Sequence, residues 1–391
     1  MSLFARLLGL LALLGLAEVL AGLLLVRRFT RRPPPPRSSR PPLSVLKPLA
    51  GDEPLLEEAL ASLCQQDYSE FQIVLGAADP ADPALAVARR VAARFPASDI
   101  TVLGGAPLSA HHPPPLNRKV ANLIAMLPVA KHGVLVIADA DVHAPPGYLD
   151  ALAAVLEEPE TGLVTTLYTG RPGVPGWPAR LGASQITHGF LPDALIARAL
   201  GRQDALGATV ALSRVVLARS GGFEALADEL ADDAVLGRRV ASLGLVVRLA
   251  ATVPATTVPE RSLGALFRHE LRWARTIRAL APAGFSLSAL RYPLAWALAA
   301  LVASGFAPWS AGLFLLAWTC RVVAARGIDR ALGLPPVLPA WLIPFRDLFS
   351  FSVLLASHAG RRVEWRGLML RAGRPGGGRR SHAPERGCSC R

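Results

Sequence analysis

The sequence has few charged residues and few sulfur-containing ones. Only 18% of its 391 residues are charged, four are cysteine and three are methionine. Two cysteines, Cys64 and Cys320, stand far apart in apolar stretches, and the other two lie in a Gly- and Arg-rich tail, so no spacing indicates a disulfide framework. This pattern suits a reducing, cytoplasm-facing body. Hydrophobic residues make up 52% of the sequence, which excludes a disordered chain. This share is higher than soluble domains usually have.

Lysine is scarce, although positive charge is not. Only three of the 42 basic residues are lysine, and the formal net charge is +13. This skew toward arginine reflects genome composition better than nucleic-acid recognition, so no nucleic-acid partner is expected. The length allows two or three domains with a sizeable core.

A long apolar run opens the chain. Residues Leu3 to Val26 are long enough to cross a bilayer. Arginines cluster around the proline run Pro33–Pro36, and such clusters stay on the cytoplasmic side. Residues 1–28 are therefore predicted to form an uncleaved transmembrane anchor, followed by a basic, Pro-rich linker over 29–42. Glu18 inside the run is either a functional intramembrane carboxylate or a group that faces a partner helix or lies near an interface.

A second membrane region is predicted over residues 286–358. Tyr292–Pro308 and Trp309–Ala325 have the composition of a hairpin of two spans. With the N-terminal anchor, three spans are expected in total. A basic tail over 359–391 follows, and if its arginines lie on the cytoplasmic side, an even number of C-terminal spans is required.

The last apolar stretch of this region, Pro339–Ser357, differs from the two spans before it. Arg346 and Asp347 stand in its middle, where two charges are costly inside a bilayer. An interfacial or re-entrant segment is therefore expected here.

Residues 43–285 alternate short apolar runs with helical patterns. Strands are predicted at Leu43–Leu46, Phe71–Gly76, Ile100–Leu103 and Gly133–Ala138, and helices at Pro54–Gln65, Pro83–Phe95 and Lys119–Ala130. This alternation predicts an α/β domain with a mostly parallel sheet covered by helices on both faces. Ligands of such sheets bind beyond the carboxyl ends of the strands.

Aspartates follow two of these predicted strands. Asp79 and Asp82 come after the second strand, and Asp139 and Asp141 after the fourth. On extended chain, Asp139 and Asp141 can point to the same side. A hard divalent cation takes such oxygen ligands and keeps other positions for phosphate and water. An Asp-x-Asp pair also arises by chance, but its place after a buried strand favours a metal-diphosphate site.

A third acidic group precedes the helical pattern Ala234–Leu243. It consists of Asp228, Glu229, Asp232 and Asp233. Negative charge at a helix N-terminus is favourable by about 0.3–1 kcal/mol, which explains one or two acids. Four acids in six residues exceed what a cap needs, so a catalytic carboxylate is predicted among them.

Arg272 and Trp273 lie on a helical stretch just before the second membrane region. The Arg272 guanidinium has the geometry to hold phosphate by two hydrogen bonds. Trp273 suits a membrane interface. An ordinary amphipathic helix is the alternative interpretation of this stretch.

Taken in order, these motifs resemble ceramide glucosyltransferases and their bacterial relatives. The resemblance covers about residues 43 to 280 and is carried by Lys47-Pro-Leu-Ala-Gly-Asp-Glu-Pro54, Gln66-Asp-Tyr68, Asp79, Asp82-Pro83, Asn117-Arg-Lys119, Asp139, Gly221-Gly-Phe223, Asp232-Asp233 and Arg272-Trp273. Among these relatives, the chain is most similar to the hopanoid-biosynthesis glycosyltransferases of bacterial inner membranes. Their tail string resembles Gly360-Arg-Arg-Val-Glu-Trp-Arg-Gly367.

The resemblance implies a Rossmann-like nucleotide-sugar transferase domain of the GT-A type and an inverting transfer from a UDP-sugar to a lipid. It also implies Mg²⁺ or Mn²⁺ as cofactor and a multi-pass protein of the bacterial inner membrane, with the catalytic domain facing the cytoplasm. The hopanoid branch implies N-acetylglucosamine transfer to bacteriohopanetetrol, and the other branch implies glucose transfer to ceramide. A processive polysaccharide synthase is an alternative, although two firm spans after the body are few for a polysaccharide channel. A non-enzymatic membrane protein that binds nucleotide is another.

The resemblance also assigns roles to the aspartates after the strands. Asp82 matches the first family aspartate, which contacts the nucleotide, with Asp79 as its neighbour. Asp139 matches the second, which serves metal and nucleotide. Animal ceramide enzymes carry Asp-Ser-Gly where this chain has Asp139-Ala-Asp141, so Asp141 adds a carboxylate that should strengthen metal binding.

The remaining roles fall on the later motifs. Asp233 matches the third family aspartate, the catalytic base, which takes the proton of the acceptor hydroxyl. Arg272 and Trp273 match the end of a Gln/Arg-x-x-Arg-Trp motif whose first position is His269 here. Arg272 and a divalent ion are expected to stabilise the charge on departing UDP. Lys119 either holds the phosphates or is a surface lysine at a helix start.

Overall fold

A computed structural model describes residues 3–32, 39–105, 117–360, 362–365 and 368–371. Part of the expected linker and most of the expected basic tail lie outside the described residues. The tail string over 360–367 is described only in part. The expected domain boundaries stay predictions.

The α/β body is built on a seven-stranded sheet in the order β3-β2-β1-β4-β8-β6-β9. The strands are β1 (Leu43–Pro48), β2 (Phe71–Ala77), β3 (Asp99–Gly104), β4 (Val134–Ala138), β6 (Thr161–Thr165), β8 (Thr209–Ser213) and β9 (Val246–Leu249). Strands β3, β2, β1 and β4 are parallel, as expected, and β6 is parallel to β9. Strand β8, which the alternating pattern did not predict, is antiparallel to both β4 and β6.

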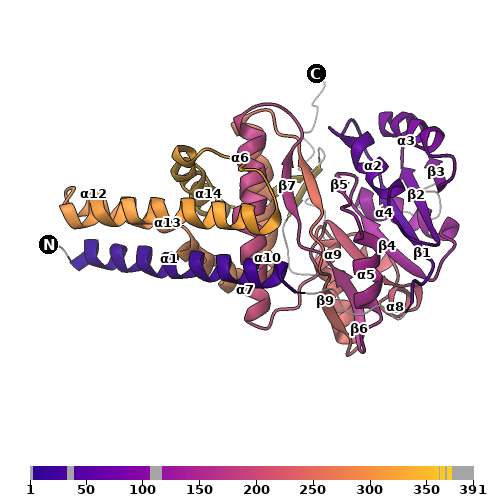
Figure 1. Ribbon diagram of the computed structural model, residues 1–391, viewed down its shortest axis with the longest axis horizontal. Coiled ribbons are helices and arrows are strands. Elements are labelled where there is room, and N and C mark those ends of the chain that lie inside the picture. Colours follow the sequence, from indigo (N-terminus) through magenta and orange to yellow (C-terminus); the bar gives the residue numbers. More distant parts are fainter. Residues whose placement is uncertain (1–2, 33–38, 106–116, 361, 366–367, 372–391) are drawn as a thin grey trace, which may run out of the picture.

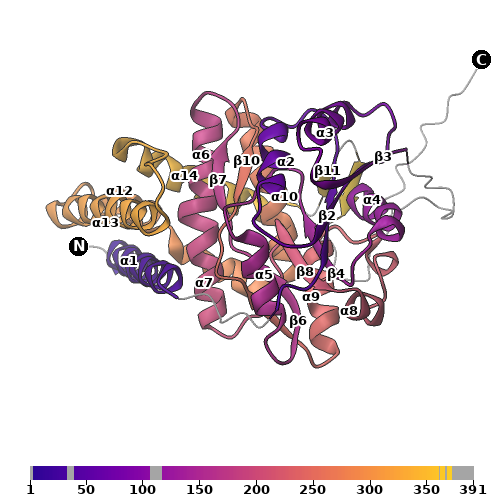
Figure 2. The same ribbon diagram turned by 45° about the vertical axis from the view of Figure 1, so that its right-hand side comes forward.

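Helices cover both faces of this sheet (Figure 2). They are α2 (Leu56–Cys64), α3 (Pro83–Arg94), α4 (Arg118–Met126), α5 (Tyr148–Leu156), α8 (Arg214–Arg219) and α9 (Asp232–Ser242). Consecutive strand residues point to opposite faces. Val45 and Ile73 therefore join the core under α2, α3 and α5, whereas Leu46 and Val74 join the core under α4 and α9.

A small second sheet connects the body to the membrane helices. Its strands are β5 (Val142–His143), β10 (Ala255–Val258) and β7 (Thr169–Pro172), in that order. The helices α6 (Trp177–Gln185), α7 (Leu191–Ala199) and α10 (Leu263–Leu280) lie beside it, and a π-helical turn, Ile186–Phe190, joins α6 to α7. In Figure 1 this layer stands between the sheet on the right and the long helices on the left.

The membrane part is a projection of helices from one end of the molecule (Figure 1). It consists of α1 (Leu3–Thr30), α12 (Pro293–Ala303) and α13 (Pro308–Leu332), with α14 (Ile343–His358) at its base and α11 (Pro282–Leu287) leading into it. Among the described residues, α1, α13 and the segment Ala340–His358 are long and apolar enough to cross a membrane. Helix α12 passes that test only together with Pro282–Arg291, at a bend of 64°. A hairpin of strands, β11 (Arg362–Trp365) and β12 (Leu368–Arg371), follows α14.

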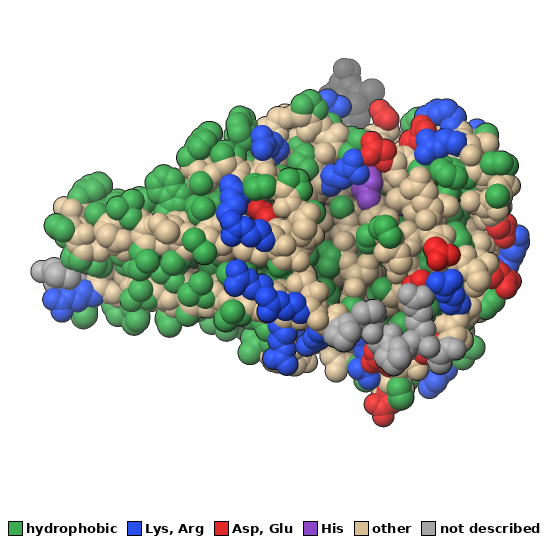
Figure 3. Space-filling view, viewed as in Figure 1, with side chains coloured by type: hydrophobic (Ala, Val, Ile, Leu, Met, Phe, Trp, Pro, Cys, Tyr) green, Lys and Arg blue, Asp and Glu red, His purple; other side chains and the backbone are tan. Residues whose placement is uncertain are grey.

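Charge marks the boundary of this projection. Its visible surface is mostly hydrophobic, and Lys and Arg side chains gather where it meets the α/β body (Figure 3). Arg27 and Arg28 occupy the last turn of α1 on that side. Such a distribution is typical of a membrane boundary.

The two charges in the last apolar stretch are paired rather than exposed to lipid. Arg346 Nη2 lies 2.6 Å from Glu270 Oε2 on α10, and Asp347 Oδ1 lies 2.8 Å from Arg321 Nη2 on α13. Both residues are buried. Pairing lowers the cost of burying them. The segment passes the length and composition test for a span, and its interfacial placement stays a prediction.

Candidate active site

One lysine and two aspartates meet where three elements of the body begin or end. Lys119 Nζ lies 2.7 Å from Asp139 Oδ1 and 3.3 Å from Asp232 Oδ2. Asp139 follows β4, Lys119 is in the first turn of α4, and Asp232 is the first residue of α9. The structure therefore brings together residues from three candidate motifs, although the first and the last are more than a hundred residues apart in the sequence. Lys119 is no simple surface lysine, because its side chain is only 21% exposed.

Asn117 holds this arrangement in place. Its Oδ1 accepts hydrogen bonds from the backbone amides of Lys119 at 3.0 Å and Val120 at 3.2 Å, which caps α4. Its Nδ2 donates to the Glu229 carbonyl at 2.9 Å, and its backbone amide donates to the Ala227 carbonyl. The start of α4 is thereby fastened to the loop before α9.

Asp233 lies at the same edge of the sheet. The backbone amide of Asp139 donates to the Ala208 carbonyl at 3.1 Å. A Cβ on the preceding Gly207 would stand 2.7 Å from Asp233 Oδ2, so Asp233 packs directly on that backbone. Burial, and then the negative charge of Asp232, raises the pKa of Asp233 to about 7. Such a carboxyl is able to exchange a proton at neutral pH.

The Asp139–Val142 segment is a turn rather than the extended chain expected. The Val142 amide donates to the Asp139 carbonyl at 3.1 Å, and the Asp141 carbonyl accepts from the Thr257 amide at 3.2 Å. Burial, and then the charge of Asp139, raises the pKa of Asp141 to about 7. The two carboxylates therefore share one electrostatic environment, although the local geometry differs from the prediction.

Lys47 is a functional candidate to which the sequence analysis assigned no role. It lies near the end of β1, its side chain is fully buried, and its Nζ donates to the Val142 carbonyl at 2.8 Å. Burial lowers the pKa of Lys47 to about 8, while Asp141 and Asp139 oppose that shift. The sequence did hold a signal for Lys47, because it continues an apolar strand. A lysine buried in this way needs negative charge nearby, which points to a site.

Asp79 and Asp82 make their described hydrogen bonds to backbone amides. Asp82 Oδ1 caps α3 by accepting from Ala84 at 2.9 Å, and it also accepts from Gly51 at 2.9 Å. Asp79 Oδ1 accepts from Ala81 at 2.8 Å. Gly51, in the loop after β1, has a φ of 75°. No contact between these two aspartates and Lys119, Asp139 or Asp232 is present among the described residues, and their nucleotide-binding roles stay predictions.

Arg272 and Trp273 lie on α10, and both are half-buried. Trp273 packs on a cluster of buried side chains that includes Ile186 and Val258. The His269 ring lies 4.5 Å from the Trp273 ring, centroid to centroid, and His269 Nδ1 is paired with Glu260. His269, which stands at the first position of the motif, is therefore already engaged by its own neighbours.

Tyr168 is a second candidate that the sequence analysis missed. It follows β6 and stacks on Phe190 with the ring centroids 4.5 Å apart. Burial, and then the charges of Asp233 and Asp139, raises the pKa of Tyr168, which places its phenol in the field of the acidic group. Its hydroxyl has no hydrogen-bond partner among the described residues. Its position after β6 could have indicated a role, but the sequence pattern did not predict that strand.

Negative charge exceeds positive charge at this edge. Lys47 and Lys119 face four carboxylates, which are Asp139, Asp141, Asp232 and Asp233, and the charge of Glu53 acts on Asp141. Within the part of the chain that is described, no three His, Cys, Asp or Glu side chains form a ready metal cage. A magnesium-type ion commonly uses only one or two carboxylates together with substrate phosphates, so the donor set fits a divalent cation that binds with a diphosphate.

Comparison with known proteins gives a family for the chain. Residues 7–377 match the family Glycosyl transferase family 21. A ceramide glucosyltransferase of Komagataella phaffii (strain GS115) is 30% identical over 128 residues, which are 32% of this chain and 25% of that protein. The match thus spans about a quarter of that relative's length.

Solved structures of lower similarity also match. A mannosyltransferase from Pyrobaculum calidifontis in complex with GDP-Man and Mn²⁺ matches with a TM-score of 0.49 and 21% identity, covering 90% of this chain and 98% of that one. A glucosyl-3-phosphoglycerate synthase from Mycobacterium tuberculosis matches with a TM-score of 0.37 and 16% identity, covering 61% and 79%. At this level of similarity, the two structures carry no information about the substrates of this chain.

The family match extends over the catalytic body and both membrane regions. It confirms the expected GT-A-type α/β fold class with flanking membrane helices, and it confirms the expected enzyme class. The chain belongs to glycosyl transferase family 21 and is, by that membership, a glycosyltransferase.

Proposed function

We propose that this protein transfers a sugar from a UDP-sugar to a hydroxyl group of a membrane lipid, with inversion of the anomeric carbon. The observation that carries the proposal is the position of Asp233 beside the Lys119, Asp139 and Asp232 group. A proton acceptor and groups able to hold a diphosphate stand at one edge of the sheet, which is the edge where ligands of such folds bind.

Asp233 is the proposed general base. With a pKa of about 7, it is about half ionised at neutral pH. It takes the proton of the acceptor hydroxyl while that oxygen attacks the anomeric carbon and the bond to UDP breaks. Because the attack comes from the face opposite the leaving group, an α-linked donor gives a β-linked product.

Positive groups of the chain would bind the donor diphosphate. Lys119 is already oriented by two carboxylates at the site, and Arg272 is proposed to bind phosphate from α10. Asp139 and Asp141 would hold Mg²⁺ or Mn²⁺, which when bound supplies neutralising charge to the diphosphate. Asp79, Asp82 and Trp273 are proposed to contact the nucleotide or sugar.

Two donor and acceptor pairs remain candidates. The likeness of the tail string to hopanoid enzymes favours N-acetylglucosamine transfer to bacteriohopanetetrol. The curated ceramide glucosyltransferase relative favours glucose transfer to ceramide. In both cases the acceptor is an amphiphile, which agrees with a catalytic body attached to long apolar helices. We place the protein in a bacterial inner membrane with the catalytic body in the cytoplasm, because the arginines gather on that side of the helices.

A transfer assay with both donors and both acceptors tests this proposal. Purified protein in mixed micelles is given labelled UDP-N-acetylglucosamine or UDP-glucose, with bacteriohopanetetrol or ceramide, and with Mg²⁺, Mn²⁺ or a chelator. Label that enters the organic phase as a monoglycosylated lipid, only with metal, supports the proposal and identifies the pair. Label in a water-soluble polymer would instead indicate a processive synthase. No transfer with any pair would contradict a lipid acceptor of these two classes.

A further inference from the structure

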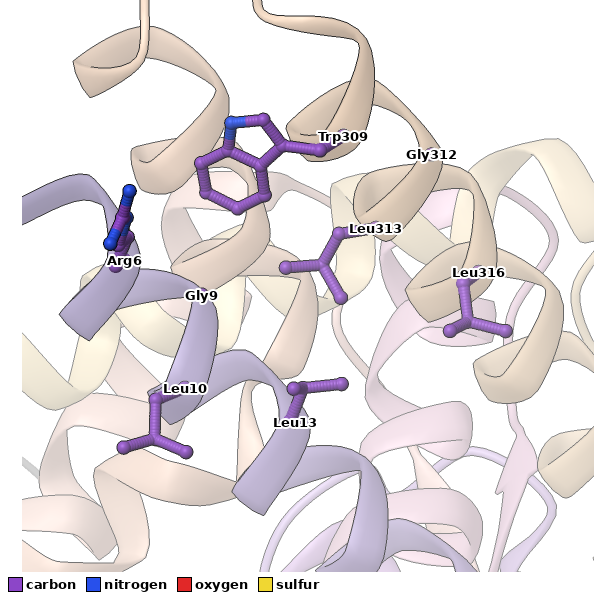
Figure 4. Close-up of a pocket in the computed structure, with 8 residues that line it drawn as sticks. All are labelled: Arg6, Gly9, Leu10, Leu13, Trp309, Gly312, Leu313 and Leu316. Carbon is purple, nitrogen blue, oxygen red and sulfur yellow. The ribbon is translucent and has the colours of Figure 1, made fainter. Parts of the chain in front are cut away.

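Helices α1 and α13 lie side by side in the same direction and approach each other closely at both ends. A Cβ on Gly9 would stand 3.1 Å from the Trp309 ring, and a Cβ on Gly327 would stand 2.7 Å from the Leu23 side chain. At the Gly9 end the side chains between the helices are mostly apolar, and Arg6 is the single basic residue that lines this surface (Figure 4). The Gly327 end, which lies nearer the α/β body, has a different character.

Arginines from both helices meet at the Gly327 end. A Cβ on Gly327 would also stand 3.3 Å from Arg27 Nη2, so the Arg27 side chain reaches from α1 onto α13. Arg330 follows Gly327 by three residues, and residues at this spacing are neighbours on a helix surface. Long side chains on a helix lean toward the preceding turn, which directs Arg330 toward Gly327. Two guanidinium groups from separate helices are therefore placed around one glycine.

The protein does not compensate these positive charges. Arg27, Arg28 and Arg330 are exposed, and their side chains make no hydrogen bond or ion pair within the part of the chain that is described. Asp329, the acid next to Arg330, is buried and lies 3.3 Å from Arg326 Nη1 instead. Like charges held close together repel, so an anion bound between the arginines would be stabilising.

The sequence keeps acidic residues away from this end of the helices. No Asp or Glu occurs over residues 19–51, 271–328 or 330–346. These ranges hold the second half of α1, the linker after it, nearly all of α13 and the segment that follows α13. Basic side chains accordingly dominate the visible surface where the helices meet the body (Figure 3). A surface with one sign of charge beside apolar helices attracts anionic lipid.

Exposed apolar side chains lie one turn further into both helices. Leu24 precedes Arg27 by three residues and is 62% exposed, and Val323 precedes Gly327 by four residues and is 54% exposed. The surface thus changes from apolar to basic along the helix axes. A molecule with hydrocarbon chains and an anionic head group matches both parts, whereas a free anion or a nucleic acid would contact the basic part alone.

We propose that Arg27 and Arg330, flanked by Leu24 and Val323, bind an anionic phospholipid where α1 meets α13. The phosphate accepts hydrogen bonds from the two guanidinium groups, and the acyl chains lie along the exposed apolar side chains. Because the two arginines belong to separate helices, the bound lipid joins the ends of α1 and α13. The site is distinct from the acidic edge of the sheet, and the uncharged acceptor lipids considered above lack the phosphate that it recognises.

Photo-cross-linking locates the bound lipid directly. The full-length protein in uncharged detergent is given photoreactive phosphatidylglycerol or photoreactive phosphatidylcholine, and the labelled peptides are identified by mass spectrometry. Phosphatidylglycerol should label peptides that contain Leu24 and Val323 more strongly than phosphatidylcholine does. Unlabelled phosphatidylglycerol should compete, and inorganic phosphate at the same concentration should not. Equal labelling by the two lipids, labelling confined to other peptides or competition by phosphate alone would each overturn the proposal.

Variants test whether the two arginines account for the binding. Each arginine near an anionic head group strengthens binding about fivefold, so Arg27→Gln/Arg330→Gln should weaken phosphatidylglycerol binding about thirtyfold. Arg27→Lys/Arg330→Lys keeps both charges and should lose less. The matched control Arg89→Gln/Arg219→Gln removes the same net charge from exposed positions on α3 and α8 and should bind as the wild type does.

The affinities are measured by titration with labelled phosphatidylglycerol, and circular dichroism in lipid-free detergent confirms that each variant is folded. Unchanged binding by the glutamine variant, or an equal loss in the control, would overturn the proposal. No sugar donor takes part in these measurements. If phosphatidylglycerol binds as expected but no sugar is transferred to any lipid, the proposed function fails while this site stands.

Discussion

Arg346 of α14 and Glu270 of α10 form a buried, two-pronged ion pair. Arg346 Nη1 lies 2.9 Å from Glu270 Oε1, and Nη2 lies 2.6 Å from Oε2. Arg346 also donates to Ser350 Oγ and to the Leu181 carbonyl on α6. Helix α10 carries Arg272 and Trp273, so the pair connects the last apolar helix to a proposed substrate-binding helix.

Removing one partner of this pair should destabilise the protein. Arg346→Met leaves the Glu270 carboxylate buried without its countercharge, at a cost of about 3–5 kcal/mol. The double variant Arg346→Met/Glu270→Met should recover much of that loss, because neither charge remains. Denaturant unfolding of the wild type and these two variants in detergent measures both effects. Equal stability of all three would show that the pair contributes nothing.

The rate of transfer should fall in acid because of Asp233. Its pKa is raised from 3.8 to about 7, so the carboxyl stays protonated below neutral pH and is then unable to accept a proton. We expect kcat/KM to rise about tenfold per pH unit between pH 5 and 6.5 and to level off above about pH 7. The surface variant Asp204→Asn should keep this profile. A flat profile down to pH 5 would exclude a base with a raised pKa.

Lys119 should matter for the donor more than for the acceptor. Lys119→Met removes a positive charge that lies 2.7 Å from Asp139 and that we propose binds the donor phosphate. The loss of one such charge-assisted contact is expected to raise the donor KM about tenfold to a hundredfold. The acceptor KM should stay within about twofold. Steady-state kinetics with each substrate varied in turn separates the two effects, and an unchanged donor KM would make Lys119 structural only.

Comparing phenylalanine variants of two tyrosines separates a role in substrate contact from a role in packing. Tyr168→Phe removes a hydroxyl that has no described protein partner, so stability should hold while kcat/KM falls about two- to tenfold. Tyr148→Phe is the matched control, because the Tyr148 hydroxyl is buried and hydrogen-bonded to Thr209 Oγ1 at 2.8 Å. It should lower stability by about 1 kcal/mol with little effect on kcat/KM. The opposite assignment of the two effects would remove Tyr168 from the substrate site.

Local pattern predicts the first half of the sheet well. Strands β1 to β4 and helices α2 to α4 form where apolar runs and helical patterns alternate, and Asp82 and Asn117 cap α3 and α4 by their side chains. Strand β8 was missed because an antiparallel strand within an α/β domain is set by pairing with β4 and β6, which are distant in sequence.

The candidate site is only partly readable from the sequence. The position after a buried strand indicated Asp139, and four acids before one helix indicated a catalytic carboxylate among them. The family resemblance then singled out Asp233 and Lys119. Lys47 and Tyr168 carry no such local signal, since their importance arises from burial near carboxylates on other elements. Arg346 and Asp347 each pair with a residue on a distant helix. The apolar run alone therefore does not reveal how the cost of burying these two charges is offset.

The most direct test of the central claim is the transfer of labelled sugar into lipid by Asp233→Asn, compared with Asp204→Asn and wild type at pH 8. Asparagine keeps the shape of the side chain but accepts no proton. We predict a fall in kcat of about a hundredfold to ten-thousandfold for Asp233→Asn, with UDP affinity retained and full activity in Asp204→Asn. Undiminished transfer by Asp233→Asn would contradict the assignment of this acidic edge as the catalytic centre.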